Sequence, residues 1–420
     1  MNVLMLSSSD IGGGAARSAY RLHQGLQAIN VDSQMLVQTK IGDDFRIIAP
    51  KGKLSKGLAK IRPVIDNLPL SFYPQCDRKV FAAQWLPNNL NQQIAQINPN
   101  IVNLHWVCDG FLPIEAITKI RQPIVWTLHD MWAFTGGCHY SYDCDRYTSN
   151  CGTCPQLDSH HDWDLSRWIW KRKHKHWQGL NLYIVTPSKW LAKCAKASSL
   201  FENVSIEVIP YGLDLKVYKP IDKLLARQIL NLPQNTKLVL FGSLSPTSDQ
   251  RKGFHLLQLA LHRLRDRTDQ AQIEVLIFGT SEPKVSLDLG FKSHYLGKLS
   301  DDISLSLIYN AADVFVAPSI EDNLPNTVLE SIACGLPVVA FDIGGMSDMI
   351  DHKANGYLAQ PFDIEDLAHG ISWILEDCDR YLNLAHQARA KAEREFSQEL
   401  QAKRYLKLFE EILSSRSSKQ

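Results

Sequence analysis

The chain has 420 residues, of which 45% are apolar and 21% are charged, and this composition excludes a disordered or collagen-like chain. Because one hydrophobic core rarely serves so many residues, we expect two domains. The 45 Lys and Arg residues balance 44 Asp and Glu residues, so the net charge of +1 provides no overall field that would attract nucleic acid.

The N-terminal half alternates short apolar runs with amphipathic stretches, a pattern typical of parallel strands joined by helices. The expected strands are Val3–Leu6, Gln34–Val37, Ile101–Leu104, Ile124–Thr127 and Tyr183–Thr186. The expected helices include Ala16–Ala28 and Asn91–Ile97. This half therefore predicts a doubly wound α/β domain, which binds ligands beyond the carboxyl ends of its strands.

A glycine loop follows the first strand and contains Gly13 and Gly14. Such a loop can bring backbone N–H groups close to a phosphate. The loop matches neither G-x-G-x-x-G nor a P-loop, so a structural turn and a ligand loop remain alternatives.

Two histidines follow expected strands, His105 after the third and His129 after the fourth. A single histidine is more often structural, but two at equivalent strand ends favour function. We expect His129 to be catalytic, because Asp130 follows it directly.

Four of the nine cysteines form the pattern C-x5-C-x6-C-x2-C: Cys138, Cys144, Cys151 and Cys154. Four thiolates within a short segment suit a tetrahedral structural zinc ion, with two disulfides or four free thiols as alternatives. The odd total and the scatter of the other cysteines argue against the disulfide framework of a secreted protein.

The segment 167–177 mixes tryptophans with Lys, Arg and His. This composition is typical of membrane interfaces and predicts peripheral contact with a membrane or a lipid phosphate. A solvated basic helix with buried tryptophans is the alternative, and RNA binding is a weaker one.

The second half repeats the α/β pattern. Its expected strands are Lys237–Phe241, Ile273–Phe278, His294–Leu296, Val314–Ala317 and Val338–Phe341, and its expected helices are Phe254–Asp266, Ile303–Ala311, Thr327–Cys334 and Ile364–Leu375. The last segment, Asp379–Ile412, is helical in period.

Two loops of this half can bind an anion. Ser243 ends a strand, and Arg251 and Lys252 stand at the start of a helix, where cations and the helix dipole can act on the same oxygen atoms. A helix beginning near Pro325 or Asn326 offers unpaired N–H groups between the acids Asp322 and Glu330. The polar loop and first turn of that helix contain Asn323, Leu324, Pro325, Asn326 and Thr327.

The chain resembles the retaining glycosyltransferases of the GT-B fold, in particular the family 4 group that builds bacterial surface polysaccharides, including a branch with a cysteine-rich insert. The resemblance is strongest over 311–350 and continues through Asn355-Gly356. It has two departures. Asp322 stands where the family has the first of two glutamates, the second being Glu330, and Ser243 stands where the family has an arginine that Arg251 is expected to replace.

The resemblance implies two facing Rossmann-like domains with the active site in the cleft between them. The N-terminal acceptor-side domain would span 1–208 with the insert 138–154, the nucleotide-sugar domain 209–390, and a helix in 391–420 would cross back to the first domain. It implies transfer of a sugar from a nucleotide-sugar donor to a hydroxyl of a glycan or lipid-linked acceptor, with retention and with the base recognised near Gly279.

In that mechanism Arg251 and Lys252 stabilise the leaving diphosphate, Asp322 holds the donor sugar and Glu330 the nucleotide ribose. No cofactor is expected for catalysis, apart from a structural zinc ion and the donor itself. An epimerase or phosphorylase on the same fold, or a non-catalytic nucleotide-sugar sensor, are the competing functions. The start MNVLMLSSSDIGGG lacks a signal-peptide pattern, so we expect a cytoplasmic protein, peripheral at the inner face of the membrane, with no nucleic-acid partner.

Overall fold

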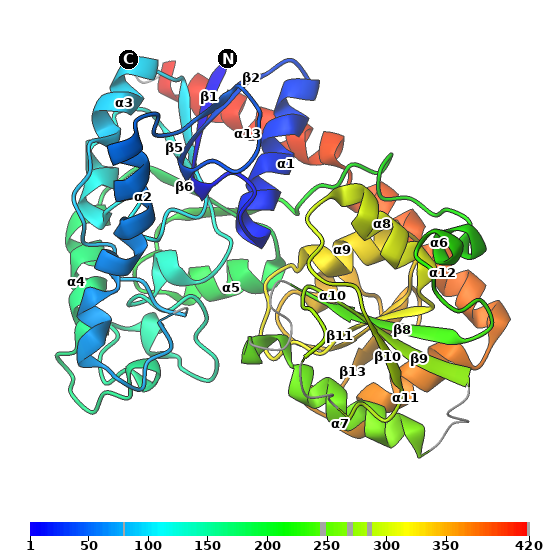
Figure 1. The fold of residues 1–420 in the computed structure, drawn as a ribbon. Helices are drawn as coiled ribbons and strands as arrows, with labels where there is room; N and C mark the ends of the chain where they lie inside the picture. The colour runs from blue at the N-terminus through cyan, green and yellow to red at the C-terminus, as the bar shows by residue number, and fades with distance from the viewer. Residues whose placement is uncertain (79, 244–248, 267–271, 284–287, 418–420) are drawn as a thin grey trace. The chain divides into compact units, whose positions relative to one another are not determined.

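The computed structural model describes residues 1–78, 80–243, 249–266, 272–283 and 288–417 (Figure 1). The chain divides into two compact units. Unit 1 contains Met1–Pro210 and Gln401–Gln420, and unit 2 contains Tyr211–Leu400. Each unit has its own parallel sheet with helices on both faces, so the α/β prediction of two Rossmann-like domains is confirmed.

The sheet of unit 1 has seven parallel strands in the order β3-β2-β1-β4-β5-β6-β7. Their bounds are β1 Asn2–Ser9, β2 Asp32–Thr39, β3 Ile47–Ile48, β4 Ile101–Leu104, β5 Ile124–Thr127, β6 Leu182–Thr186 and β7 Ser205–Val208. The strand order reverses between β1 and β4. At such a point the connections after the two strands leave on opposite faces of the sheet, which opens a site for a ligand.

Helices cover both faces of this sheet: α1 Gly14–Ala28, α2 Lys53–Asp66, α3 Leu90–Ile97, α4 Leu165–Trp177, α5 Lys189–Ala197 and α13 Gln398–Ser417. Short 3-10 turns connect them: η1 Leu68–Phe72, η2 Ile114–Lys119, η3 Trp132–Phe134, η4 Arg146–Thr148 and η5 Pro155–Leu157. On one face Trp177 packs edge to face against Trp126 and Trp132, whose rings are tilted relative to each other. On the other face α1 and α13 share a core with the strands, in which Tyr405 and Phe409 are fully buried.

The sheet of unit 2 has six parallel strands in the order β10-β9-β8-β11-β12-β13. Their bounds are β8 Lys237–Gly242, β9 Ile273–Phe278, β10 Lys292–Tyr295, β11 Val314–Ala317, β12 Val338–Phe341 and β13 Gly356–Ala359. The helical elements are α6 Lys223–Ile229, η6 Gln250–Lys252, α7 Phe254–Arg265, α8 Asp302–Ala311, α9 Asn326–Ala333, α10 Met346–Met349, α11 Ile364–Leu375 and α12 Cys378–Glu395.

The C-terminal segment, which is helical in period over 379–412, forms two helices. The helix α12 ends at Glu395, where the backbone of the next residues bonds to Leu213 and does not continue the helix. Leu213 N–H donates to the carbonyl of Phe396 at 2.8 Å, and Gln398 N–H donates back to the carbonyl of Leu213 at 2.9 Å. The Ser397 hydroxyl then accepts from Leu400 N–H at 3.2 Å and supports the start of α13.

None of the helices described by the structure combines the length and the apolar composition that crossing a membrane requires.

A buried carboxylate holds the base of unit 2 together. The two oxygens of Asp313 lie 2.7 Å from Lys223 Nζ and 2.6 Å from Arg227, and one also accepts from Leu238 N–H at 2.7 Å. The side chains of Arg227 and Asp313 are almost fully buried. Asp313 thereby links α6 to the starts of β8 and β11.

We predict that Asp313→Asn lowers the melting temperature markedly, because it leaves the Arg227 guanidinium buried without a counter-charge, at a cost of about 3 kcal/mol or more. The measurement is a thermal unfolding scan. The matched control is Glu411→Gln, which removes an exposed ion pair with Lys407 and should change the melting temperature little. Equal effects of the two changes would contradict the prediction.

Candidate functional site

In unit 2, the predicted cations Arg251 and Lys252 lie in the turn η6 between β8 and α7. The Asp249 carboxylate accepts from Arg251 N–H at 3.1 Å and fixes the start of this turn. Gly253 follows with φ of +70° and lets α7 begin at once. Ile320 N–H donates to the backbone carbonyl of Arg251 at 2.8 Å, so the turn is tied to the loop after β11.

Three predicted catalytic residues meet at this junction. Lys252 Nζ lies 2.6 Å from Asp322 Oδ2, and Arg251 Nη1 lies 3.2 Å from the same oxygen. The other carboxylate oxygen accepts from Asn323 N–H at 3.0 Å. The structure thus brings Arg251, Lys252 and Asp322 into one buried ion cluster at the carboxyl ends of β8 and β11.

The cluster determines the ionisation of its members. Burial by itself favours the neutral acid, but the charges of Lys252 and Arg251 and the hydrogen bonds lower the pKa of Asp322 to about 2. Burial also lowers the pKa of Lys252, against the opposing attraction of Asp322. At neutral pH the carboxylate therefore carries a full charge between two cations.

Two glycines permit this close approach of loops. A Cβ atom on Gly253 would lie 1.8 Å from the carbonyl oxygen of Pro318, and one on Gly344 would lie 2.0 Å from the carbonyl oxygen of Asp322. Both glycines have positive φ. Neither position can accept a side chain without moving the loop that carries Asp322.

Several predicted binding residues line a small pocket beside the cluster. Its lining includes Ser243, Lys252, Ser319, Pro325 and Thr327. Pro325 caps α9, so the first N–H groups of this helix lie at the pocket. Of the other predicted residues in this loop, Asn323 and Leu324 are buried, and Asn326 is the first residue of α9.

Glu330 is buried within α9, and Tyr309 of α8 donates its hydroxyl to Glu330 Oε2 at 2.9 Å. This partner was not predicted from the sequence. Gly279 follows β9 with φ of +93°, and its N–H donates to the carbonyl of Gly297 at 2.7 Å. Gly279 therefore stands at the same edge of the sheet, but it does not line the pocket beside Lys252.

In unit 1, His129 ends a chain of buried polar groups. His129 Nε2 lies 3.0 Å from His105 Nδ1, and His105 Nε2 lies 2.9 Å from Asn103 Oδ1. The Asn103 amide donates to the hydroxyl of Thr127 at 3.1 Å, and that hydroxyl lies 2.8 Å from the hydroxyl of Tyr405 in α13. The chain connects the second C-terminal helix with the ends of β4 and β5.

These hydrogen bonds determine the tautomers of the two histidines. The Asn103 amide nitrogen donates to the Val125 carbonyl and the Thr127 hydroxyl. Its oxygen therefore faces His105 and accepts a hydrogen bond from Nε2–H. His105 Nδ1 then accepts from His129 Nε2–H, which leaves His129 Nδ1 with a lone pair. Burial lowers the pKa of His129 to about 4, against the attraction of Asp130, so the ring is neutral at pH 7.

The partner of Asp130 corrects the reason given for His129. Asp130 Oδ2 accepts from His139 Nδ1 at 2.8 Å and from Trp106 Nε1 at 2.8 Å, and Oδ1 accepts from Trp132 N–H at 2.8 Å. The aspartate that follows His129 thus orients His139, whose ring stacks on Trp106. Sequence reasoning did not single out His139, which lies inside the cysteine-rich insert.

The glycine loop after β1 is built on Asp10, another residue that the sequence did not indicate. The buried Asp10 carboxylate accepts from Ile41 N–H and Gly42 N–H at 2.9 and 2.8 Å. Gly13 has φ of +104° and caps α1, which begins at Gly14. A Cβ atom on Gly13 would meet nothing within 4 Å, so the backbone is open to approach there.

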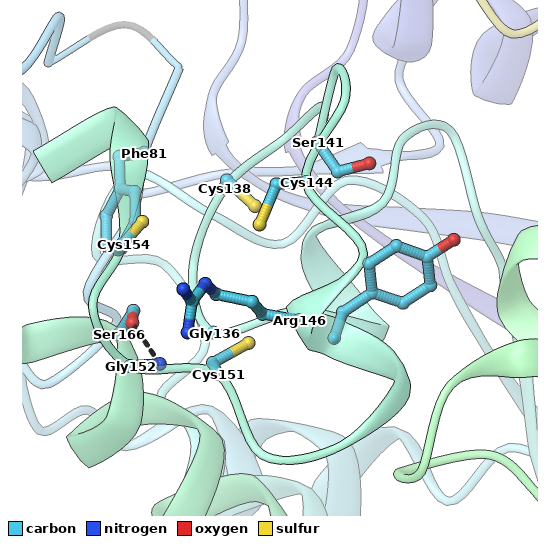
Figure 2. Close-up of a pocket in the computed structure, with 11 residues that line it drawn as sticks. Phe81, Gly136, Cys138, Ser141, Cys144, Arg146, Cys151, Gly152, Cys154 and Ser166 are labelled. Atoms are coloured by element: carbon cyan, nitrogen blue, oxygen red, sulfur yellow. Dashed lines mark hydrogen bonds between the residues drawn. The ribbon is translucent and has the colours of Figure 1, made fainter. Parts of the chain in front are cut away.

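The four cysteines of the insert surround one cavity, which Phe81 and Arg146 also line. Figure 2 shows their sulfur atoms around the cavity, with the Arg146 side chain extending among them. All four are free thiols. Among the described residues no three His, Cys, Asp or Glu side chains are placed so that they hold a metal ion. The four cysteines thus border one cavity without a disulfide between them, and the structural zinc ion stays a prediction.

The predicted membrane segment 167–177 forms most of α4, and one face of it is buried while Trp168, Lys171 and Lys175 are exposed. Trp170 and Trp177 are buried, and so is Lys173, whose ammonium donates to the carbonyl of Thr135 at 3.0 Å. Arg172 makes a bidentate pair with Glu115 at 2.7 and 2.8 Å. Of the three tryptophans in α4 only Trp168 is well exposed, so one face of this helix belongs to the core, and membrane contact through 167–177 stays a prediction.

We predict that Gly253→Ala destabilises the protein more than Gly297→Ala. Both glycines have φ near +70°, so both changes carry the backbone strain of about 1 kcal/mol. Nothing lies within 4 Å of a Cβ at Gly297, whereas the Cβ at Gly253 collides with Pro318. Thermal unfolding of the two variants measures the difference, and equal melting temperatures would show that the loops do not meet in this way.

The ion cluster also predicts a pH dependence. Because the pKa of Asp322 is depressed to about 2, its stabilising contribution is present above about pH 4 and is lost as the pH falls from about 4 to about 2. Asp322→Asn should therefore lower stability by about 2 kcal/mol at neutral pH and by progressively less below pH 4. Denaturant titrations of both proteins across this range measure the gap, and a gap independent of pH would refute the assignment.

Known structures share this fold over almost the whole chain. Sucrose-phosphate synthase from Thermosynechococcus elongatus is similar with a TM-score of 0.71 and 18% identity, covering 99% of this chain and 100% of that one. HepE from Anabaena, in complex with UDP and glucose, is similar with a TM-score of 0.64 and 18% identity, covering 98% and 99% of the two chains. At these identities the likeness concerns the fold alone.

Curated relatives match only in part. A Campylobacter jejuni N,N'-diacetylbacillosaminyl-diphospho-undecaprenol alpha-1,3-N-acetylgalactosaminyltransferase is 34% identical over 145 residues, which are 34% of this chain and 38% of that protein. D-inositol 3-phosphate glycosyltransferase from Gordonia bronchialis is 30% identical over 206 residues, which are 45% and 43% of the two chains. The chain thus matches about two fifths of the length of these relatives.

Two family models match consecutive parts of the chain. The model for Glycosyltransferase Family 4 matches residues 12–217, and the model for Glycosyl transferases group 1 matches residues 235–377. Between them they take in most of the chain, and each falls on one Rossmann-like unit. The chain therefore belongs to the group 1/family 4 superfamily of GT-B glycosyltransferases.

Proposed function

We propose that this chain is a retaining glycosyltransferase that moves a sugar from a nucleotide-sugar donor to a hydroxyl of a glycan or lipid-linked acceptor in polysaccharide biosynthesis. The observation that carries the proposal is the buried cluster of Arg251, Lys252 and Asp322 beside the first turn of α9. The superfamily to which the chain belongs supports the reaction class. HepE, which shares the fold, binds UDP and glucose. This complex supports our proposal that the donor of this chain is a nucleotide sugar.

In the proposed reaction the bond between the anomeric carbon and the diphosphate breaks while the acceptor oxygen bonds to that carbon from the same face. The acceptor proton passes to an oxygen of the departing diphosphate. The charge that grows on this leaving group is the main electrostatic problem, and Lys252, Arg251 and the N–H groups at the start of α9 are suited to stabilise it. Asp322 then accepts hydrogen bonds from hydroxyls of the donor sugar.

The remaining residues receive supporting roles. Glu330, oriented by Tyr309, holds the ribose, and Gly279 lies where the base is recognised. Arg251 takes the role of the arginine that the family has at the position of Ser243. No side-chain nucleophile and no metal ion has a part in this proposal.

On the acceptor side, we assign His129 the role of a neutral hydrogen-bond acceptor at the end of β5. His105 holds the ring through Nε2, which orients it for a hydrogen bond with the acceptor. The open backbone at Gly13, followed by Gly14 as the first residue of α1, lies after β1 in the same unit and is suited to an anionic group.

We predict that Lys252→Ala and Arg251→Ala each reduce kcat by about 100-fold, because each removes a donor to charge that appears only as the diphosphate leaves. Initial rates with radiolabelled nucleotide sugars measure the effect. Lys252→Arg is the matched control, since it retains a cation at the same position and should recover part of the rate.

Glu321 provides the control for the register of the loop. Its backbone carbonyl accepts from Arg251 at 3.0 Å, and this contact does not depend on its side chain. Glu321→Ala should therefore remain close to wild type while Asp322→Ala loses at least tenfold in kcat/KM. Loss in the Glu321 variant alone would overturn the assignment of Asp322.

The same assay separates the competing functions by product. A glycosylated acceptor supports transfer, whereas a free epimer, a sugar phosphate, or binding without turnover would replace the proposal with an epimerase, a phosphorylase or a sensor. A panel of nucleotide sugars scored by thermal shift identifies the donor beforehand, because a ligand at 100 times its Kd stabilises the folded protein by about 2.7 kcal/mol.

A further inference from the structure

The helix α2 of unit 1 has one face fixed to the rest of the unit. Arg62 donates to the carbonyls of Gly110 at 2.8 Å and Pro87 at 2.9 Å. The buried Asp66 carboxylate accepts from the backbone N–H groups of Gln84 and Trp85, both at 3.0 Å. Farther along, the Tyr73 hydroxyl accepts from Leu165 N–H at the start of α4. The helix and the turn η1 are therefore held in place from their inner side.

The outer face of the same segment carries a series of large apolar side chains. Leu54 is 92% exposed and Phe72 is 84% exposed. Between them the other exposed apolar side chains are Leu58, Ile61, Val64 and Leu68. In α2 the spacing of Leu54, Leu58 and Ile61 places them on one stripe of the helix. We call these six residues, with the exposed lysines beside them, the α2–η1 surface.

Exposed lysines accompany the apolar stripe. Lys51, Lys53, Lys56 and Lys60 are all exposed. From residue 45 to residue 76 the sequence contains one acidic residue, Asp66, and its carboxylate is buried. The surface therefore combines positive charge with exposed apolar area, while the chain as a whole has a net charge of only +1.

We propose that the α2–η1 surface docks this protein on an anionic phospholipid bilayer, with the helix lying in the plane of the interface. Apolar side chains on an amphipathic helix enter the boundary between headgroups and acyl chains, and adjacent lysines attract anionic headgroups. The helix α4, for which the sequence predicted membrane contact, exposes only Trp168 of its three tryptophans, and Trp170, Trp177 and Lys173 are buried.

The charge of the surface favours a bilayer over a second copy of the chain. A symmetric contact through α2 would bring two sets of lysines together without an acid to oppose them, which is unfavourable. A fluid anionic surface supplies compensating charge along the whole helix and requires no shape complementarity. The proposal concerns location and does not depend on the reaction proposed above.

The test is flotation of the full chain with two kinds of vesicle, pure phosphatidylcholine and an equimolar mixture of phosphatidylcholine with phosphatidylglycerol. We expect binding to the anionic vesicles that weakens with added salt. The variant Lys53→Gln/Lys56→Gln/Lys60→Gln should bind about 100-fold more weakly, at about fivefold per lysine. The variant Leu54→Ser/Leu58→Ser should lose at least tenfold.

Matched controls keep the result interpretable. Lys193→Gln/Lys196→Gln/Lys407→Gln removes three exposed lysines from other helices of unit 1, and Leu224→Ser removes an exposed leucine of unit 2. Both should bind vesicles like wild type, and circular dichroism of all variants should be unchanged. Wild-type protein that floats with neither vesicle would overturn the proposal, as would equal losses in the control variants or a dimer that depends on Leu54 and Leu58.

Discussion

The pairing of Asp322 with Lys252 and Arg251 is the interaction on which the arrangement of unit 2 depends. Two cations with little exposure to water require a counter-charge, because a buried unpaired charge costs several kcal/mol. Asp322 supplies it, but only when the loop after β11 reaches the turn before α7. Gly253 and Gly344 lie at the points of contact, and this approach is sterically possible because glycine has no side chain. The carboxylate thus holds the cations in place beside the start of α9.

In unit 1 the buried polar side chains that lead to His129 are neutral, in contrast to the charged cluster of unit 2. The polar chain from Tyr405 to His129 is buried, and every member described in it has a hydrogen-bond partner. Low solvent access keeps both histidines neutral, so the chain orients a ring without placing charge in the interior. Because Tyr405 belongs to α13, the C-terminal helix supports the ends of β4 and β5 directly.

Burial also decides which basic helix faces solvent. α2 and α4 both carry several cations and large apolar residues, and their compositions alone favour α4, with its three tryptophans, as the interfacial helix. Packing reverses this order. In α4 the ammonium of Lys173 lies 3.7 Å from the ring of Trp132 and the guanidinium of Arg172 is paired with Glu115. In α2 the leucines have no such cover within the described part of unit 1.

The sequence alone determined the two parallel sheets, because strands covered by helices on both faces read as continuous apolar runs. It also indicated Lys252, Arg251 and Asp322, since loops after such strands hold ligand-binding residues at short, regular spacing. Three contacts became visible only in the tertiary structure, because the spacing of residues in the sequence does not determine them. Asp130 bonds to His139, which a loop brings next to it. The cysteines of the insert border a cavity. Backbone bonds to Leu213 separate the two C-terminal helices. Such contacts depend on the path of the chain through space, which local periodicity does not encode.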